Sequence, residues 1–121
     1  MQAVGLFKEV TVAGKKKVKA LAKFDTGAKA TSIDSALAKK AGLGPVLKHK
    51  KVKSASSSGH SRPVVKAKIK IGRKEFVAEV NVTARTHSKC KVLIGRDIIL
   101  NNFVIDVSKT HKGPGEKDVR A

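Results

Sequence analysis

Asp25 stands where a carboxylate could do chemistry. It directly follows an apolar segment that ends at Phe24, and it begins the run Asp25-Thr26-Gly27. A tight turn through Gly27 would surround the carboxylate with donors from the turn backbone and from Thr26. A carboxylate held in this way can act as a general acid or base. Asp-Thr-Gly is also an ordinary turn, so the tripeptide alone leaves a purely structural role open.

The side chains that could bind a metal are scattered. His87 and Cys90 have a spacing that suits one pair of zinc ligands, but His49, His60 and His111 supply no evident second pair. Cys90 is the only cysteine, which excludes an internal disulfide and suits a reducing compartment. We therefore predict no metal site and no cofactor.

The composition is strongly basic. The chain has 121 residues, enough for one domain, with 27 basic and 9 acidic residues and a net charge of +18. Such a surface attracts acidic partners, although a highly charged, solvated surface without a partner is an alternative. Nucleic acid is not the favoured partner, because most of the basic residues are lysines and the aromatic side chains that stack on bases are nearly absent.

Alternation of apolar and polar residues predicts β-strands along most of the chain. It runs through Lys17–Phe24, Val65–Ile71 and Phe76–Val82, with one face of each strand on a core and one in water. The turn residues Gly14-Lys15-Lys16 and Gly72-Arg73-Lys74 would join neighbouring strands. The fold class is therefore all-β.

One or two short helices interrupt this pattern. Asp34 can cap a helix over Ser35–Lys40, and Gly42 is placed to end it. A second short helix is expected over Arg96–Leu100, followed by a strand at Phe103–Val107.

The rest of the chain has fewer signals. The small polar segment Ser54–Ser61 is predicted to be a hairpin tip or a loop. We divide the chain into a domain at 1–108 and a flexible, charged tail at 109–121. The N-terminus lacks the apolar region of a signal peptide, and no apolar run reaches the ~18 residues that span a bilayer. We therefore expect a cytoplasmic protein that does not enter membranes.

The order of these segments resembles the retropepsin-like aspartic proteases over roughly residues 15 to 108. The matching segments are Asp25-Thr26-Gly27-Ala28, the helix Asp34–Gly42, the hairpin tip Ser54–Ser61 and the run Val92–Leu100. Two separate motifs in the right order, with a hairpin between them, carry the resemblance.

Within that superfamily the chain is most similar to a group labelled ATP-dependent zinc proteases. The similar runs are Asp25–Ser32, Arg62-Pro63-Val64, Thr83-Ala84-Arg85, Leu93–Arg96 and Val104-Ile105-Asp106. The chain has no Walker-type phosphate loop and is too short to hold a separate ATPase.

The resemblance implies a closed retropepsin-like β-barrel and a role for each matching residue. Asp25 would be the catalytic carboxylate, within an active-site turn completed by Thr26, Gly27 and Ala28. A flap over the substrate would contain Ser56, Ser57, Ser58, Gly59 and His60. The supporting residues beneath the turn would be Leu93, Ile94, Gly95 and Arg96.

The resemblance also implies a homodimer. Hydrolysis by an aspartic protease needs two carboxylates that share one proton, and this chain has a single Asp-Thr-Gly. Asp25 of each subunit would therefore meet on a two-fold axis, where Thr26 would hold the two turns together.

Lys29 departs from the pattern of many retroviral members, which place an acidic residue here to pair with the Arg of the Gly-Arg motif. Arg96 must therefore find another partner. Lys29 could bind an acidic side chain of the substrate, or it could be a solvated lysine.

We predict an aspartic endopeptidase that acts on peptides or proteins, with a preference for acidic, glutamate-rich substrates. The basic surface and the ligase-associated members of the similar group both favour that preference. The alternative is a non-catalytic basic module on the same fold that binds acidic protein or nucleic acid.

Overall fold

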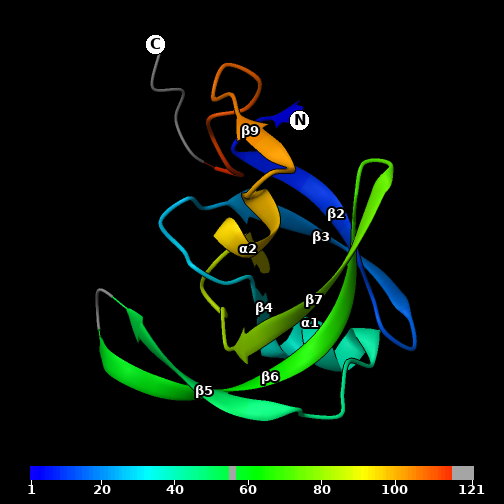
Figure 1. The fold of residues 1–121 in the computed structure, drawn as a ribbon, viewed down its shortest axis with the longest axis vertical. Helices are drawn as coiled ribbons and strands as arrows, with labels where there is room; N and C mark the ends of the chain where they lie inside the picture. The colour runs from blue at the N-terminus through cyan, green and yellow to red at the C-terminus, as the bar shows by residue number, and fades with distance from the viewer. Residues whose placement is uncertain (55–56, 116–121) are drawn as a thin grey trace.

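The computed structural model describes residues 1–54 and 57–115, with only the backbone path described for 52–54 and 57–60. The chain is mostly β with two short helices (Figure 1). The strands are β1 (Gln2–Val4), β2 (Phe7–Ala13), β3 (Lys17–Phe24), β4 (Ser32–Asp34), β5 (Lys48–Ser54), β6 (Ser57–Ile71), β7 (Lys74–Thr83), β8 (Val92–Ile94) and β9 (Phe103–Ile105). The helices are α1 (Ser35–Ala41) and α2 (Arg96–Ile99).

Six strands close into a barrel. They follow the order β2-β3-β8-β4-β7-β6, and antiparallel pairing of β2 with β6, from Thr11↔Lys70 to Ala13↔Lys68, closes the ring. Among the described strands β5 pairs with β6 alone, so the hairpin that it forms with β6 projects from the barrel (Figure 1). The predicted all-β class and the closed barrel are confirmed.

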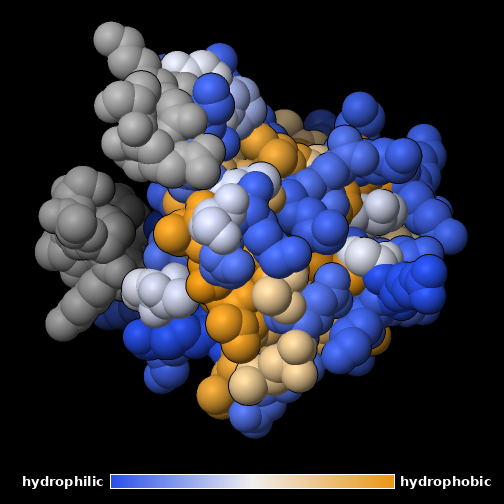
Figure 2. Space-filling model, turned by 90° about the horizontal axis from the view of Figure 1, so that it is seen from above, coloured by the Kyte–Doolittle hydropathy of each residue, from blue (hydrophilic) through white to orange (hydrophobic). Residues whose placement is uncertain are grey.

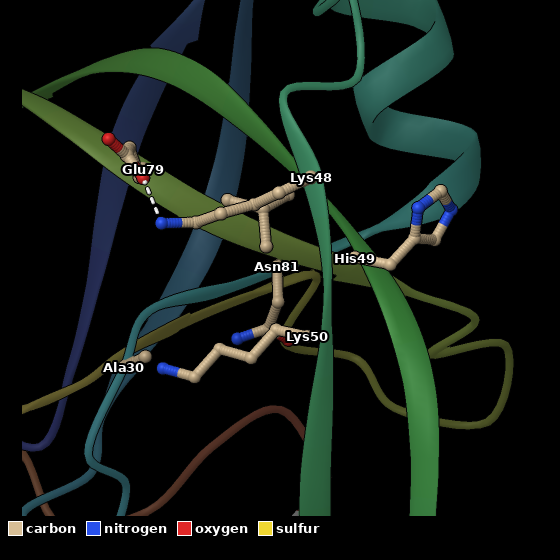
Figure 3. Close-up of a pocket in the computed structure, with 7 residues that line it drawn as sticks. Ala30, Lys48, His49, Lys50, Glu79 and Asn81 are labelled. Atoms are coloured by element: carbon tan, nitrogen blue, oxygen red, sulfur yellow. Dashed lines mark ion pairs between the residues drawn. The ribbon is translucent and has the colours of Figure 1, made fainter.

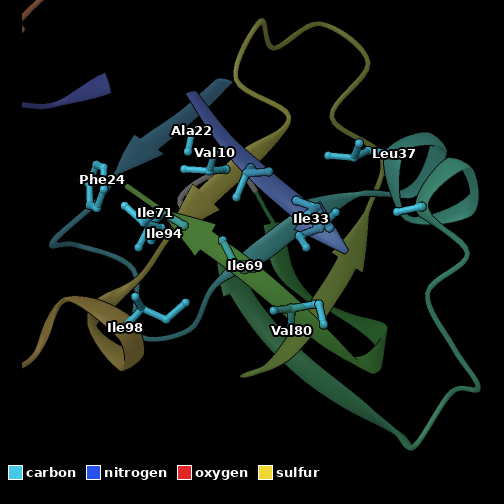
Figure 4. Packing of buried hydrophobic residues seen from close by; sticks show 14 of the residues in the cluster. Val10, Ala22, Phe24, Ile33, Leu37, Ile69, Ile71, Val80, Ile94 and Ile98 are labelled. Atoms are coloured by element: carbon cyan, nitrogen blue, oxygen red, sulfur yellow. The ribbon is translucent and has the colours of Figure 1, made fainter. Parts of the chain in front are cut away.

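The alternating segments form the barrel because each strand buries one face. In β6 the residues Val65, Ala67, Ile69 and Ile71 are buried, and the lysines between them are exposed. Their side chains meet those of the other strands in a single core made almost wholly of aliphatic residues (Figure 4). Val, Ile and Leu side chains suit the pleated, half-buried surface of such strands, so the core needs few aromatic residues.

Helix α1 begins and ends as the sequence predicts. The side chain of Asp34 accepts a hydrogen bond from the backbone N–H of Leu37 at 3.2 Å, and Gly42 ends the helix in the left-handed conformation at φ 67°. A left-handed C-terminal residue favours glycine, which lacks the Cβ that would clash. α2 ends one residue earlier than expected, and β9 two residues earlier.

The described residues of the segment Ser54–Ser61, predicted to be a hairpin tip or a loop, belong to the β5–β6 hairpin, but strand pairing extends further into the segment than expected. β6 begins at Ser57 and pairs with β5, from Lys51↔Ser61 to Ser54↔Ser57. Serine is a common turn residue, which explains the prediction, but pairing with a neighbouring strand outweighs this weak local preference.

A small parallel sheet of β1 and β9 lies beside the barrel. Phe103 of β9 is buried against Phe24, with the ring centroids 5.5 Å apart. Beyond β9, the hydroxyl of Thr110 donates to the carbonyl of Phe7 at 3.0 Å and accepts from its N–H at 3.1 Å. The boundary at residue 108 stays a prediction.

One face of the molecule carries exposed apolar residues. Figure 2 shows a band of hydrophobic side chains bordered by hydrophilic ones on the face seen from above. Among the large exposed apolar residues, Leu100 directly follows α2, Val104 lies in β9 and Val107 follows β9.

Neither of the helices that the structure describes is long and apolar enough to cross a bilayer.

Candidate active site

The carboxylate of Asp25 is positioned by the end of β3 and by its own turn. The strand carries Phe24 into the core, and the Asp25 N–H then donates to the carbonyl of Ile94 in β8 at 2.8 Å. The Oδ1 atom of Asp25 accepts a hydrogen bond from the Gly27 N–H at 2.9 Å, and the Ala28 N–H donates to the Asp25 carbonyl at 3.1 Å. Asp25 is half-buried and has no ion pair with any described residue. Its carboxylate is therefore oriented while one oxygen is left available.

Gly95 supports this turn from beneath. A Cβ atom at Gly95 would lie 2.6 Å from the carbonyl carbon of Ala30 and 3.0 Å from the carbonyl oxygen of Ala28. The next residue, Arg96, donates its backbone N–H to that Ala28 carbonyl at 2.8 Å. Only glycine allows the chain after β8 to pass this close to the turn.

Arg96 contacts the turn through its side chain as well. Its Nη1 lies 3.4 Å from the carbonyl oxygen of Thr26 and donates a hydrogen bond to it. This backbone carbonyl is the hydrogen-bond partner of the Arg96 side chain. An acidic partner is not present at position 29, which is occupied by Lys29. Lys29 is exposed, and its carbonyl accepts from the Asp97 N–H at 3.2 Å. The assignment of Lys29 to substrate binding stays a prediction.

Thr31 and Asp97 form a second link between the two motifs, to which the sequence analysis assigned no role. The fully buried Thr31 donates its hydroxyl to Asp97 Oδ1 at 2.8 Å and its N–H to Asp97 Oδ2 at 3.1 Å. The same hydroxyl accepts from the Gly95 N–H at 3.1 Å. The only sequence signal for this link was that Asp97 directly follows the Gly-Arg motif. Its partner Thr31 lies 66 residues away in the chain, so the sequence did not indicate the contact.

The link continues to the base of the hairpin. The buried Asn81 in β7 donates its side-chain amide to the Thr31 carbonyl at 3.1 Å, and its Oδ1 accepts from Arg62 Nη1 at 3.0 Å. Burial lowers the pKa of Arg62, and the nearby charge of Arg85 lowers it further. Arg62 Nε is buried and has no hydrogen-bond partner among the described residues.

Arg85 connects the loop after β7 to helix α1. Its N–H donates to Asp34 Oδ1 at 2.8 Å, and its Nε donates to the carbonyl of Cys90 at 3.0 Å. Burial alone would raise the pKa of Asp34, but the hydrogen bonds from Arg85 and Leu37 and the charge of Lys91 together hold that pKa below its ordinary value. This cluster braces the barrel near the candidate site.

The predicted flap residues lie in the projecting hairpin or outside the described residues. Ser57, Ser58, Gly59 and His60 belong to the backbone of β6, and Ser56 lies outside the described residues. In Figure 1 the hairpin and the turn at residues 25–30 project on the same side of the barrel. Their assignment as a flap stays a prediction.

The described residues do not fit a zinc site. No three of the His, Cys, Asp or Glu side chains within the described part of the chain gather closely enough to hold a metal ion. His87 is exposed and Cys90 is buried.

The closed barrel, with its Asp-Thr-Gly turn resting on Ile94-Gly95-Arg96, defines a protein of the retropepsin class. A sequence model described as retropepsin-like aspartic endopeptidase RimB matches residues 34–114, about two thirds of the chain. The chain belongs to this RimB-like family. The match begins at Asp34 and does not include the Asp25 turn.

Solved structures show the same fold. A Legionella pneumophila protein of unknown function is 25% identical, with a TM-score of 0.63 over 88% of this chain and 94% of that one. EIAV protease in complex with an inhibitor is 15% identical, with a TM-score of 0.64 over 77% of this chain and 83% of that one. A retropepsin-like aspartic protease from Rickettsia conorii is 19% identical, with a TM-score of 0.56 over 78% of this chain and 70% of that one. A search of curated proteins finds no match.

Proposed function

We propose that the chain is an aspartic endopeptidase whose active site is formed by Asp25 from each of two identical subunits. The observation that carries this proposal is the carboxylate of Asp25, held by the Gly27 N–H and free of ion pairs among the described residues, in a chain of the RimB-like family. The chain has only one Asp-Thr-Gly, so a second copy must supply the other carboxylate.

The other aspartate near this turn is not a suitable partner within the same chain. The carboxylate of Asp97 already accepts hydrogen bonds from the Thr31 hydroxyl, the Thr31 N–H and the Ile98 N–H. These donors hold it as a structural group beneath the turn. A dyad formed across two subunits therefore accounts for the site better than a pair within one chain.

In the proposed reaction the two carboxyl groups share one proton. The ionised group takes a proton from a water molecule, whose oxygen attacks the carbonyl carbon of the peptide. The protonated group donates to the carbonyl oxygen, which stabilises the tetrahedral intermediate. A proton then passes to the leaving amine as the carbon–nitrogen bond breaks. The projecting hairpin would close over the substrate and exclude water from its surroundings.

The dimer would also cover exposed apolar surface. Leu100, Val104 and Val107 are exposed on or beside α2 and β9, and large exposed apolar residues favour association. The hydroxyl of Thr26, on the exposed tip of the turn, is available for a hydrogen bond across the two-fold axis.

We further propose that the substrates are acidic proteins or peptides, such as glutamate-rich tails. The net charge of +18 favours the encounter with such chains. Lys29 lies in the loop that follows the catalytic turn, where its charge would favour an acidic residue of the substrate.

The test is the peptidase activity of the purified protein on a glutamate-rich peptide and on its glutamine counterpart, with Asp25→Asn and a control Glu75→Gln. Asp25→Asn should reduce cleavage at least about a thousandfold, because the dyad loses its ionisable group, and should leave the fold and the dimer intact. Glu75→Gln removes an exposed carboxylate and should cleave normally.

Cleavage that survives in Asp25→Asn would contradict the assignment of Asp25. If neither protein cleaves but both bind the acidic peptide equally, the chain is a binding module. Equal cleavage rates on the glutamate-rich peptide and its glutamine counterpart would contradict the preference for acidic substrates but not the peptidase activity.

A further inference from the structure

A hollow of about 350 Å³ lies between the loop that follows the catalytic turn and the hairpin. Ala30 forms one side, and Lys48 and Lys50 of β5 form the other, with Asn81 of β7 also lining the hollow. Figure 3 shows Lys48 directed toward Glu79, while the side chain of Lys50 extends toward Ala30. A substrate lying between the turn and the hairpin would pass this hollow.

The strand register gathers positive charge on this face. Lys50 of β5 is paired with Arg62 of β6, and Val64 of β6 is paired with both Lys48 and Asn81. Paired residues on neighbouring strands project to the same face, as do residues two apart on one strand. Lys48, Lys50 and Arg62 therefore lie on the same face as Asn81.

The negative charge on this face compensates for only one of these cations. Glu79 forms an ion pair with Lys48 at 2.9 Å. Neither Lys50 nor Arg62 has an ion pair with any acidic residue that the structure describes. Arg62 donates from Nη1 to Asn81, but its buried Nε donor has no hydrogen-bond partner there. Because buried donors are normally paired, the unpartnered Nε and the unneutralised charges of Lys50 and Arg62 favour a negatively charged group on this face.

We propose that this hollow is a subsite for an acidic side chain of the substrate, in which Lys50 binds the carboxylate and Arg62 adds to the positive potential. The inference rests on the proposed function, and it assigns the acidic preference to a particular place in the molecule. Lys50 is suited to this role because its side chain is exposed, has no ion pair with any described residue and is directed toward the loop that follows Asp25. Lys48 contributes less, since Glu79 already neutralises it.

The test compares Lys50→Gln with Lys51→Gln. Lys51 is the next residue of β5, is also exposed and is paired with Ser61. Successive residues of a strand point to opposite faces, so Lys51→Gln removes the same charge from the other face. The substrates are peptides that differ only in carrying Glu or Gln at one position near the scissile bond, scanned along the peptide.

The measured quantity is the ratio of kcat/KM for the Glu peptide to that for the Gln peptide. For one position of the Glu or Gln residue in the peptide, Lys50→Gln should lower this ratio about tenfold, as expected for the loss of one charge-assisted hydrogen bond. Lys51→Gln should leave the ratio within about twofold, because a charge outside the hollow acts only through screened long-range attraction. An unchanged ratio in Lys50→Gln, or an equal fall in both variants, would overturn the proposal.

A binding measurement separates this proposal from the peptidase function. The same fluorescent peptides are titrated at fixed salt into Asp25→Asn chains with or without Lys50→Gln. Tighter binding of the Glu peptide that depends on Lys50 would support the subsite even if the wild-type chain cleaves nothing. If the wild-type chain cleaves and its preference for the Glu peptide does not depend on Lys50, the proposed subsite is wrong but the peptidase function stands.

Discussion

Two aspartates near the candidate site are held in different ways. Asp25 Oδ1 accepts a hydrogen bond from the Gly27 N–H, whereas the Asp97 carboxylate accepts from the backbone and hydroxyl of Thr31. The first arrangement leaves one carboxylate oxygen available for the proposed chemistry, and the second fixes the loop that follows the Asp25 turn. Residue type alone does not distinguish these roles, because both are aspartates beside a turn.

At the residue scale, we predict that Thr31→Val destabilises the fold. The substitution keeps the shape of the side chain but leaves the buried Gly95 N–H without its partner, and it removes one of the two donors to Asp97 Oδ1, which keeps the Ile98 N–H. The free energy of unfolding should fall by about 1–3 kcal/mol, the cost of an unpaired buried polar group. Urea unfolding measures this change. Thr31→Ser keeps the hydroxyl and is the matched control, so a similar loss in both variants would assign the effect to packing instead.

At the scale of the element, helix α1 depends on a carboxylate that serves two partners. Asp34 accepts from the Leu37 N–H within the helix and from the Arg85 N–H after β7. Asp34→Ala should therefore cost about 2 kcal/mol, the upper range for a helix cap, because it also leaves the Arg85 donor unpaired. Ser35→Ala, at an exposed neighbouring position, should change the stability little. A loss no greater than that of Ser35→Ala would contradict this role.

The same carboxylate makes the stability depend on pH. The pKa of Asp34 is lower in the folded chain than its ordinary value, so its ionised form stabilises the fold at any pH above that ordinary value. The contribution falls as the pH drops below it and is lost once the pH passes the folded pKa. Asp34→Asn cannot titrate, so its loss of stability on acidification, followed by urea unfolding at several pH values, should be smaller than that of the wild type. Parallel acid curves would contradict the prediction.

The projecting hairpin is the element for which the local sequence was least informative. Its serine-rich segment reads as a turn, but from Ser57 onward the backbone is paired with β5. The pairing brings Lys48 and Lys50 of β5 to the face that also holds Arg62 and Asn81, where we propose the acidic subsite.

At the scale of the whole molecule, charge opposes the proposed dimer. Each subunit carries +18, so two copies repel each other when they associate. Salt screens such repulsion within a Debye length of ~8 Å at physiological ionic strength. We therefore predict that the dimer dissociation constant falls when NaCl rises from about 50 to about 300 mM. Sedimentation equilibrium measures it.

A charge-reduced variant provides the control for this experiment. Lys16→Glu lies on the exposed turn between β2 and β3 and lowers the net charge of each subunit by two. Its dimer should be tighter at low salt and less sensitive to added salt. A wild-type dimer that weakens with salt would instead indicate that attraction between opposite charges dominates the interface.

The sequence by itself determined strand β3, the alternating parts of β6 and β7, the helix α1 with both of its ends, and the place of Asp25 after β3. These features depend on residues close together in the chain, where alternation, caps and turn residues have direct physical consequences. The tertiary structure decided that β2 pairs with β6 to close the barrel, that Thr31 contacts Asp97, and that Lys50 and Arg62 share a face. Contacts of this kind join residues distant in the chain, and they form only when the packed strands bring them together.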